Sequence, residues 1–200
     1  MARKRKSTIN EIAQFLGEAV KEVLEMNTGS PIKIAPTLQR ISNVSLRPDI
    51  GCFVEFNGDY NGLLCMNFSK DAALELYQKA MKTLGLPEEE IASDPLAEEV
   101  SNFVGEIVNQ IIGNFRRKIE QKYGLVAYNN QPRAIVVSRT IIMYIDTFLQ
   151  SSQSRKIAFR TEEGKSFYAE ISLEQTEFIP YGKPEEAEEA SVEDLLNEFF

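Results

Sequence analysis

A chain of 200 residues is long enough for one domain with tails, and a content of 43% hydrophobic and 10% aromatic residues is ordinary for a globular core. The net charge of −8 argues against a nucleic-acid partner, and the absence of histidine excludes Ser-His-Asp and Cys-His catalytic sets and the usual zinc ligands. No apolar run approaches the roughly 20 residues of a membrane span, so no membrane partner is expected.

The chain opens with a basic stretch, MARKRK, that no apolar segment follows. Residues 1–7 are therefore predicted to be a disordered arm and not a signal peptide. A helix is predicted over residues 8–26, with Thr8 and Glu11 as a capping box at its start. The two cysteines, Cys52 and Cys65, lie in apolar alternating runs and are predicted to be buried and reduced, which is typical of a cytoplasmic protein.

Extended segments are predicted at 32–46, 50–56 and 63–68, the first with Pro36 at an edge or bend. Asn57-Gly58 between two alternating apolar runs predicts a β-hairpin. A second helix is predicted over 69–84 with Ser69 as its N-cap, followed by a short acidic connection at 88–93.

The most informative stretch is a long helix predicted over 94–123, with Asp94 as its N-cap and Pro95 in the first turn. Apolar residues three and four apart are expected to form one buried stripe: Leu96, Val100, Phe103, Val104, Ile107, Val108, Ile111, Ile112, Phe115 and Ile119. The opposite face is expected to carry Glu99, Asn102, Glu106, Asn109, Gly113 and Arg117.

Three positions make that face unusual. Glu106 and Asn109 are one turn apart, so their side chains are neighbours. Gly113, one turn further, costs about 1 kcal/mol relative to alanine inside a helix, which predicts a flat place where another backbone approaches. The alternative is a glutamate and an asparagine on an ordinary solvated face.

Strands are then predicted at 134–138, 141–148, 156–161 and 167–173, which closes a domain at residues 8–180. Residues 181–190 are charged and poor in apolar residues, so they are predicted to be an acidic linker. The last segment, residues 191–200, carries Val192, Leu195, Leu196 and Phe199 at helical spacing and is predicted to be an amphipathic partner-binding peptide. The alternative is a helix that folds back on its own domain.

The pattern Gly105-Glu106-x-x-Asn109-x-x-x-Gly113 resembles the signature helix of the CheX/CheC/FliY chemotaxis phosphatases. The hairpin Phe56-x-Gly58-Asp59-x-x-Gly62 is similar to a structural turn of the CheX family. CheC-like relatives carry a second motif on an equivalent helix, for which Glu11-Ile12-Ala13-Gln14 is the expected degenerate counterpart. The resemblance implies an α+β protein of the CheX/CheC-like fold, with an antiparallel sheet packed against long amphipathic helices.

The same resemblance implies a function. These phosphatases remove the phosphoryl group from the aspartate of a CheY-like response regulator. Asn109 would then orient the attacking water, and Glu106 would pair with a lysine of the regulator. Gly113 and Asn102 would contact the partner. The enzyme would need no cofactor or metal of its own, because the receiver domain supplies the Mg²⁺.

The C-terminal peptide is similar to the CheY-binding tail of CheZ, an unrelated CheY phosphatase, and is expected to tether the substrate. Two other hypotheses stay open. The chain could be a non-catalytic CheX-like adaptor that binds a receiver domain or a flagellar or signalling partner. It could also be a homodimer of other function, because CheX-like chains pair edge strands across subunits.

Overall fold

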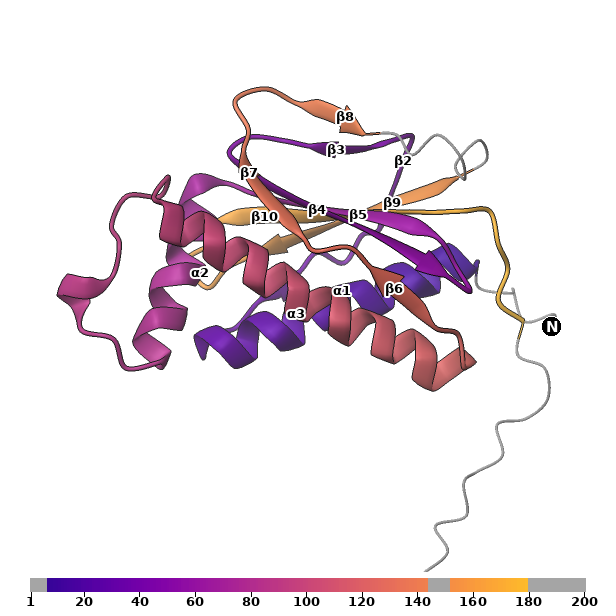
Figure 1. Ribbon diagram of the computed structural model, residues 1–200, viewed down its shortest axis with the longest axis horizontal. Helices are drawn as coiled ribbons and strands as arrows, with labels where there is room; N and C mark the ends of the chain where they lie inside the picture. Colours follow the sequence, from indigo (N-terminus) through magenta and orange to yellow (C-terminus); the bar gives the residue numbers. More distant parts are fainter. Residues whose placement is uncertain (1–6, 144–151, 180–200) are drawn as a thin grey trace, which may run out of the picture.

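The computed structural model describes residues 7–143 and 152–179, which fold into three layers. Three helices lie on one face of a mainly antiparallel sheet, and a two-stranded ribbon covers part of the other face (Figure 1). The predicted α+β class and the antiparallel sheet on long helices are confirmed. Residues 1–6 of the basic arm, the C-terminal linker and the C-terminal peptide lie outside the described residues.

The elements in chain order are α1 (Thr8–Thr28), β1 (Lys33–Ile34), β2 (Gln39–Ile41), β3 (Val44–Leu46), β4 (Ile50–Gly58), β5 (Gly62–Phe68), α2 (Lys70–Thr83), a short 3₁₀ helix (Glu88–Glu90), α3 (Glu98–Tyr123), β6 (Ala127–Asn129), β7 (Arg133–Val136), β8 (Ile141–Met143), β9 (Gln153–Arg160) and β10 (Ser166–Leu173). The sequence did not predict β6. Part of the strand predicted at 141–148 lies outside the described residues.

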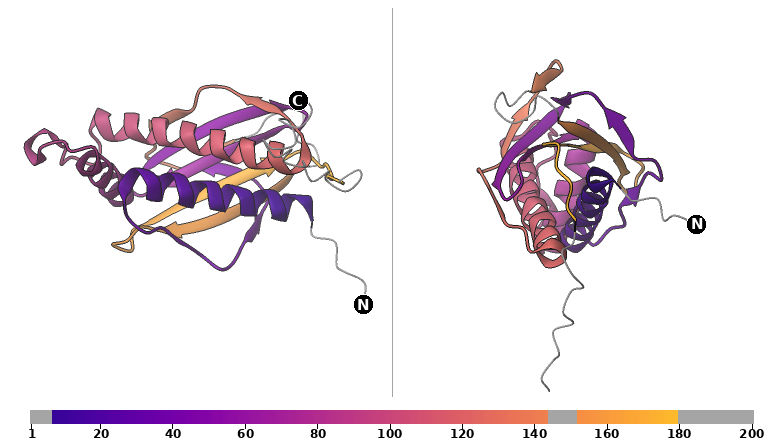
Figure 2. Two further views of the ribbon diagram at one scale, coloured as in Figure 1. Left: turned by 90° about the horizontal axis from the view of Figure 1, so that it is seen from below. Right: turned by 90° about the vertical axis from the view of Figure 1, so that its right-hand side faces the viewer.

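The chain folds as two halves with matching strand pairings. The strands β1 and β2 of the first half both pair with β9 of the second half, and β6 and β7 of the second half both pair with β4 of the first half. The equivalent strands β3 and β8 pair with each other, and so do β5 and β10. Helices α1 and α3 open the two halves and lie side by side under the sheet (Figure 2), whereas α2 belongs to neither repeat.

The predicted hairpin is present, with β4 and β5 joined by Asp59, Tyr60 and Asn61. A Cβ atom at Gly62 would lie 2.4 Å from the carbonyl oxygen of Ser172 and 2.5 Å from the ring of Phe56, so only glycine fits where β5 begins.

The main core lies between the helices and the sheet. The predicted stripe of α3 is buried there from Val100 to Ile119, except that Phe103 is only partly covered. Both cysteines are buried and free. Burial raises the pKa of both thiols, that of Cys52 to about 12, so neither is a reactive thiolate at neutral pH.

The predicted N-caps of two helices are wrong. Helix α1 starts at Thr8 as predicted, but its N-cap is Ser7, and the Thr8 hydroxyl instead accepts the backbone N–H of Phe178 at 3.0 Å. The Glu11 carboxylate accepts hydrogen bonds from Lys122 and Tyr123 of α3. Helix α3 begins at Glu98, because the Asp94 carboxylate instead accepts the backbone N–H of Leu96 in a local turn.

That turn also carries Leu96 off the helix, so the side chain predicted at the start of the buried stripe is half exposed. The predicted cap of α2 is confirmed, because the Ser69 hydroxyl accepts the backbone N–H of Ala72 at 3.2 Å.

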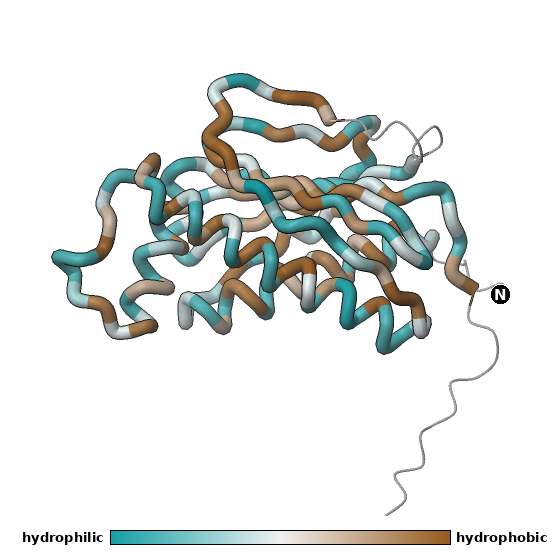
Figure 3. The backbone as a smooth tube through the Cα atoms, in the orientation of Figure 1, coloured by the Kyte–Doolittle hydropathy of each residue, from teal (hydrophilic) through white to brown (hydrophobic). Residues whose placement is uncertain are grey.

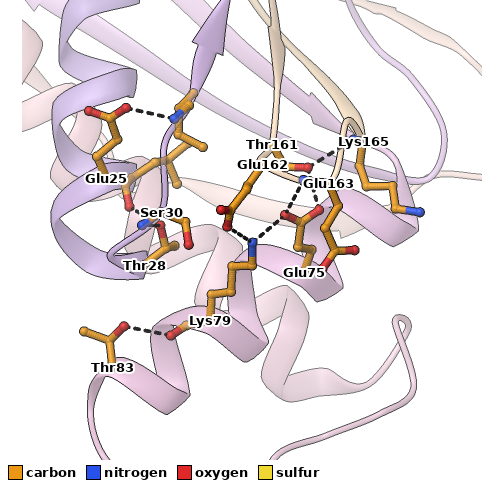
Figure 4. A network of polar contacts seen from close by, with 12 residues as sticks. Glu25, Thr28, Ser30, Glu75, Lys79, Thr83, Thr161, Glu162, Glu163 and Lys165 are labelled. Atoms are coloured by element: carbon orange, nitrogen blue, oxygen red, sulfur yellow. Dashed lines mark hydrogen bonds and ion pairs between the residues drawn. The ribbon is translucent and has the colours of Figure 1, made fainter.

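Polar contacts fix α2 against the end of the sheet (Figure 4). The Glu75 carboxylate is 7% exposed and accepts hydrogen bonds from the Thr161 hydroxyl and, at 3.2 Å, from the backbone N–H of Glu163. Lys79 lies 3.0 Å from Glu75 and 2.7 Å from Glu162. Burial disfavours the charged ammonium, but the hydrogen bonds to Glu162 and Glu75 outweigh it and raise the pKa of Lys79.

Candidate functional site

The predicted polar face of α3 is present and exposed. Its members Glu99, Asn102, Glu106, Asn109, Gly113 and Arg117 all point away from the core. Their placement follows from helical periodicity, because the stripe of Val104, Ile107, Val108 and Ile111 is buried against the sheet and α1. The four predicted partner-binding residues of the tail, Val192, Leu195, Leu196 and Phe199, lie outside the described residues.

Glu106 and Asn109 open into a groove between α3 and the loop that leads into β7. We call this the β7-side groove. It measures about 260 Å³ and is lined by Ser101, Asn102, Gly105, Glu106, Asn109, Gln131, Pro132, Arg133 and Ala134. At Gly105 an added Cβ would lie 3.9 Å from the Cβ of Ala134, which is an ordinary van der Waals distance. The packing of α3 against β7 therefore does not by itself require glycine at position 105.

The side chains at the centre of the groove are unpaired. Within residues 7–143 and 152–179, neither Glu106 nor Asn109 forms a hydrogen bond or an ion pair with another side chain. Polar residues beside them on α3 are engaged instead. Gln110 accepts a hydrogen bond from Asn27 at 3.0 Å, and Asn114 donates one to Glu22 at 3.2 Å. The donors and acceptors of Glu106 and Asn109 are therefore available to a ligand or a partner.

Sequence reasoning missed Arg133. It is exposed in the β7-side groove, and no side-chain partner holds its guanidinium in the described part of the chain. A free guanidinium beside an amide and a carboxylate provides planar donors that suit phosphate or carboxylate oxygens. The position follows an irregular segment, Asn130-Gln131-Pro132, that has no helical or strand period, so no pattern links it to α3.

Gly113 lies one turn beyond Asn109 on the same exposed face. An added Cβ would meet nothing within 4 Å in the described structure. The chain's own packing therefore does not require glycine there, which leaves the predicted flat approach for another molecule as the interpretation of this position.

The counterpart of this site in the first half is displaced from its predicted position. Buried and exposed residues of α1 and α3 coincide when Phe15-Leu16-Gly17-Glu18 is set against Phe103-Val104-Gly105-Glu106. Glu18 then corresponds to Glu106, so the prediction that Glu11-Ile12-Ala13-Gln14 is the degenerate motif is wrong. Glu11 lies two helical turns before Glu18 and does not line the equivalent groove beside β1, which Gln14, Gly17 and Glu18 line.

In this register Lys21 occupies the place of Asn109. Its ammonium pairs with Glu25 and donates to the backbone carbonyl of Ile32 at 3.2 Å. Glu18 lies 3.6 Å from the ammonium of Lys118. Both first-half positions therefore have partners within the fold, in contrast to Glu106 and Asn109.

The described residues contain no group of three or more acidic or cysteine side chains placed to hold a metal ion. In the same segments, no helix combines the length and the apolar character that a membrane crossing requires.

Comparison with known proteins identifies the fold. A family model described as "Protein of unknown function (DUF3334)" matches residues 3–199. No curated protein sequence matches the chain. Among solved structures, the chemotaxis protein CheX from Desulfovibrio desulfuricans is 24% identical with a TM-score of 0.65, and the match covers 82% of this chain and 99% of that one.

A chemotaxis protein from Desulfovibrio vulgaris Hildenborough is 22% identical with a TM-score of 0.68, over 82% of this chain and 97% of that one. CheX in a CheX–CheY complex with BeF₃ and Mg²⁺ from Borrelia burgdorferi is 18% identical with a TM-score of 0.61, over 82% of this chain and 98% of that one. These likenesses confirm the predicted CheX/CheC-like fold.

Proposed function

Because this chain belongs to the family described as "Protein of unknown function (DUF3334)" and has the CheX/CheC fold, we propose that it is a phosphatase acting on the phosphoaspartate of a CheY-like response regulator. A protein of the same fold has been observed in a complex with CheY, which supports a receiver domain as the partner and chemotaxis signalling as the setting. The observation that carries the proposal is the unpaired Glu106 and Asn109 side by side in an open groove.

The chemistry needs little from the phosphatase. Hydrolysis of a phosphoaspartate requires a water in line with the phosphorus and stabilisation of charge on the phosphoryl oxygens. The Asn109 amide both donates and accepts hydrogen bonds, so it orients that water. Glu106 accepts from a lysine of the receiver and fixes the docked geometry. The receiver brings its own Mg²⁺, and this chain contributes no metal or cofactor.

Partner contacts extend from this centre. Asn102 borders the same groove, and Gly113 leaves room for the receiver's loops on the far side of Asn109. The C-terminal peptide, with Val192, Leu195, Leu196 and Phe199, tethers the receiver and raises its local concentration. The reaction takes place in the cytoplasm, a reducing compartment that suits the free thiols of Cys52 and Cys65.

The alternative function is a non-catalytic adaptor that binds a receiver domain without turning it over. The first half supports this alternative, because Lys21 in place of asparagine shows that the fold persists where the motif is lost. The two functions differ in whether Asn109 is needed for turnover or only lies at the binding face.

Dephosphorylation of a panel of acetyl-phosphate-labelled receiver domains from the same genome tests the proposal. We expect the wild-type chain to accelerate loss of label from one or a few receivers, and Asn109→Ala to reduce that rate about 100-fold, the scale of losing one positioned catalytic group. Binding of the receiver to Asn109→Ala should change little.

Asn114→Ala is the matched control, because it removes an asparagine of the same helix whose amide is engaged with Glu22. It should keep the wild-type rate. Binding without acceleration by the wild-type chain would favour the adaptor, and equal rates for wild type and Asn109→Ala would refute the role of Asn109.

A further inference from the structure

A second groove lies on the other side of α3 from the β7-side groove. We call it the α2-side groove. It measures about 520 Å³ and is lined by Asn27, Tyr77, Ala80, Met81, Leu84, Glu99, Asn102, Phe103, Glu106, Ile107 and Gln110. Its walls are largely apolar, and Leu84 at its rim is 71% exposed. Glu106 and Asn102 border both grooves, so the α2-side groove is continuous with the candidate catalytic centre.

The wall that carries Tyr77, Met81 and Leu84 is formed by α2 and its C-cap, Leu84, and the internal repeat does not contain this helix. The contacts of Glu75 and Lys79 with the turn between β9 and β10 hold this helix in place (Figure 4). The hydrogen bond between Asn27 and Gln110 links α1 and α3 at the same end of the molecule. These contacts hold the elements that line the groove in place. The groove lies beside the candidate site in the second half of the chain.

Charge restricts what this groove accepts. Its two charged lining residues, Glu99 and Glu106, are both acidic. The connection before α3 adds Glu89 and Glu90 on the exposed surface nearby in sequence, whereas Glu88 pairs with Lys82 at 2.7 Å. An occupant that carries lysine or arginine beside an apolar side chain is favoured, and an acidic occupant is repelled.

The same argument disfavours the chain's own C-terminal peptide as the occupant. That peptide carries Glu193, Asp194 and Glu198 and no basic residue, and the preceding linker is acidic as well. An intramolecular docking of this segment would place carboxylates against Glu99 and Glu106.

We propose that the α2-side groove is the specificity surface for the receiver domain, an inference that rests on the proposed function of the adjoining site. It takes an apolar side chain from a surface segment of the receiver that is flanked by lysine or arginine. A segment seated against Met81, Leu84 and Phe103 lies beside Glu106, which borders both grooves and is one helical turn from Asn109.

Leu84→Lys tests this inference, because it replaces an exposed apolar side chain at the rim by a charge that repels a basic segment. We expect the dissociation constant for a receiver activated with BeF₃⁻, a mimic of its phosphoryl group, to rise about tenfold, as for loss of an apolar anchor in an interface. KM for the phosphorylated receiver should rise similarly while kcat changes less than about twofold, because the reacting groups are untouched.

Met26→Lys is the matched control. Met26 is 70% exposed, it lies on α1, and it does not line the groove. Leu84→Ile should restore wild-type affinity, because it keeps an apolar side chain of the same volume.

The outcomes separate this inference from the proposed function. If a receiver binds, Leu84→Lys weakens binding and no receiver is dephosphorylated, the groove inference holds and the phosphatase proposal fails. If Leu84→Lys binds receivers as tightly as wild type does, the inference is wrong even when turnover is present. If no receiver binds, both are wrong. Capture of a synthetic peptide of residues 191–200 by wild type and not by Leu84→Lys would also overturn the groove inference, because the occupant would then be the chain's own tail.

Discussion

At the scale of single residues, the contrast between free and engaged polar side chains marks the site. Glu106, Asn109 and Arg133 have no side-chain partner in the described structure, whereas Gln110 and Asn114 beside them do. Unpaired groups contribute little to folding, so their arrangement around one groove is explained by something that binds there. Arg133 is the member of this set that adds positive charge to a site otherwise made of an amide and a carboxylate.

Replacement of Arg133 tests whether its guanidinium acts on the phosphoryl group. We expect Arg133→Ala to lower kcat/KM for the labelled receiver by about 10- to 100-fold, because a charge-assisted hydrogen bond to the phosphoryl oxygens is lost. Arg133→Lys should restore only part of the rate, since the ammonium keeps the charge but not the planar pair of donors. Stopped-flow measurement of label loss checks this, and an unchanged rate in Arg133→Ala would exclude the contact.

Sequence patterns predicted Glu106 and Asn109 but not Arg133 for a physical reason. The first two lie on one long helix, where a period of 3.6 residues fixes which side chains share a face. Arg133 reaches the groove through the pairing of β7 with β4, a long-range contact that leaves no local period in the sequence.

At the scale of elements, helix interiors were predictable, whereas the N-caps of α1 and α3 were not. The buried stripe of α3 follows from its own periodicity. The start of α3 depends on whether the Asp94 carboxylate caps a helix or closes a local turn with Leu96, and both use the same kind of hydrogen bond. Glu11 was equally ambiguous, because its position fits a capping box while its carboxylate reaches Lys122 and Tyr123 of another helix.

Gly113 provides a test at this scale, because stability and docking oppose each other there. Gly113→Ala should raise the free energy of unfolding by about 1 kcal/mol, since the helix gains propensity and nothing lies within 4 Å of the added Cβ. Denaturant unfolding followed by circular dichroism measures this change.

A large side chain at the same position should act on the partner instead. Gly113→Leu is expected to fold at least as stably as wild type and to weaken receiver binding. Glu120→Leu, an exposed position two turns further along α3, serves as the control. Equal receiver affinity for Gly113→Leu and wild type would show that the flat place is not part of the docking face.

At the scale of the whole molecule, the predicted fold is confirmed while the relation between its halves had to come from the structure. The matching pairings of β1 and β2 with β9 and of β6 and β7 with β4 reveal the repeat. Sequence reasoning sought the first-half motif by its residue types and placed it at Glu11, whereas the fold preserves the burial pattern and has replaced the asparagine by Lys21.

The outer strands bear on oligomeric state. Apolar side chains of β7 and β8 are exposed, with Val136 at 52% and Ile142 at 54%, and Figure 3 shows this hydrophobic stretch along the outside of the molecule. We therefore expect a homodimer at tens of micromolar in sedimentation velocity, formed through this surface. Ile142→Lys should convert it to a monomer of unchanged thermal stability, and a wild-type monomer at that concentration would contradict the expectation.

The ion pair between Lys21 and Glu25 bears on the number of receiver domains that one chain can bind. A protein with two equivalent halves would titrate with two receivers, and its rate would rise in two steps or cooperatively. Here Lys21, at the motif position of the first half, is engaged in internal contacts. The α2-side groove lies beside the site of the second half only. Each chain is therefore expected to saturate at a stoichiometry of one, with a simple hyperbolic dependence of rate on receiver concentration.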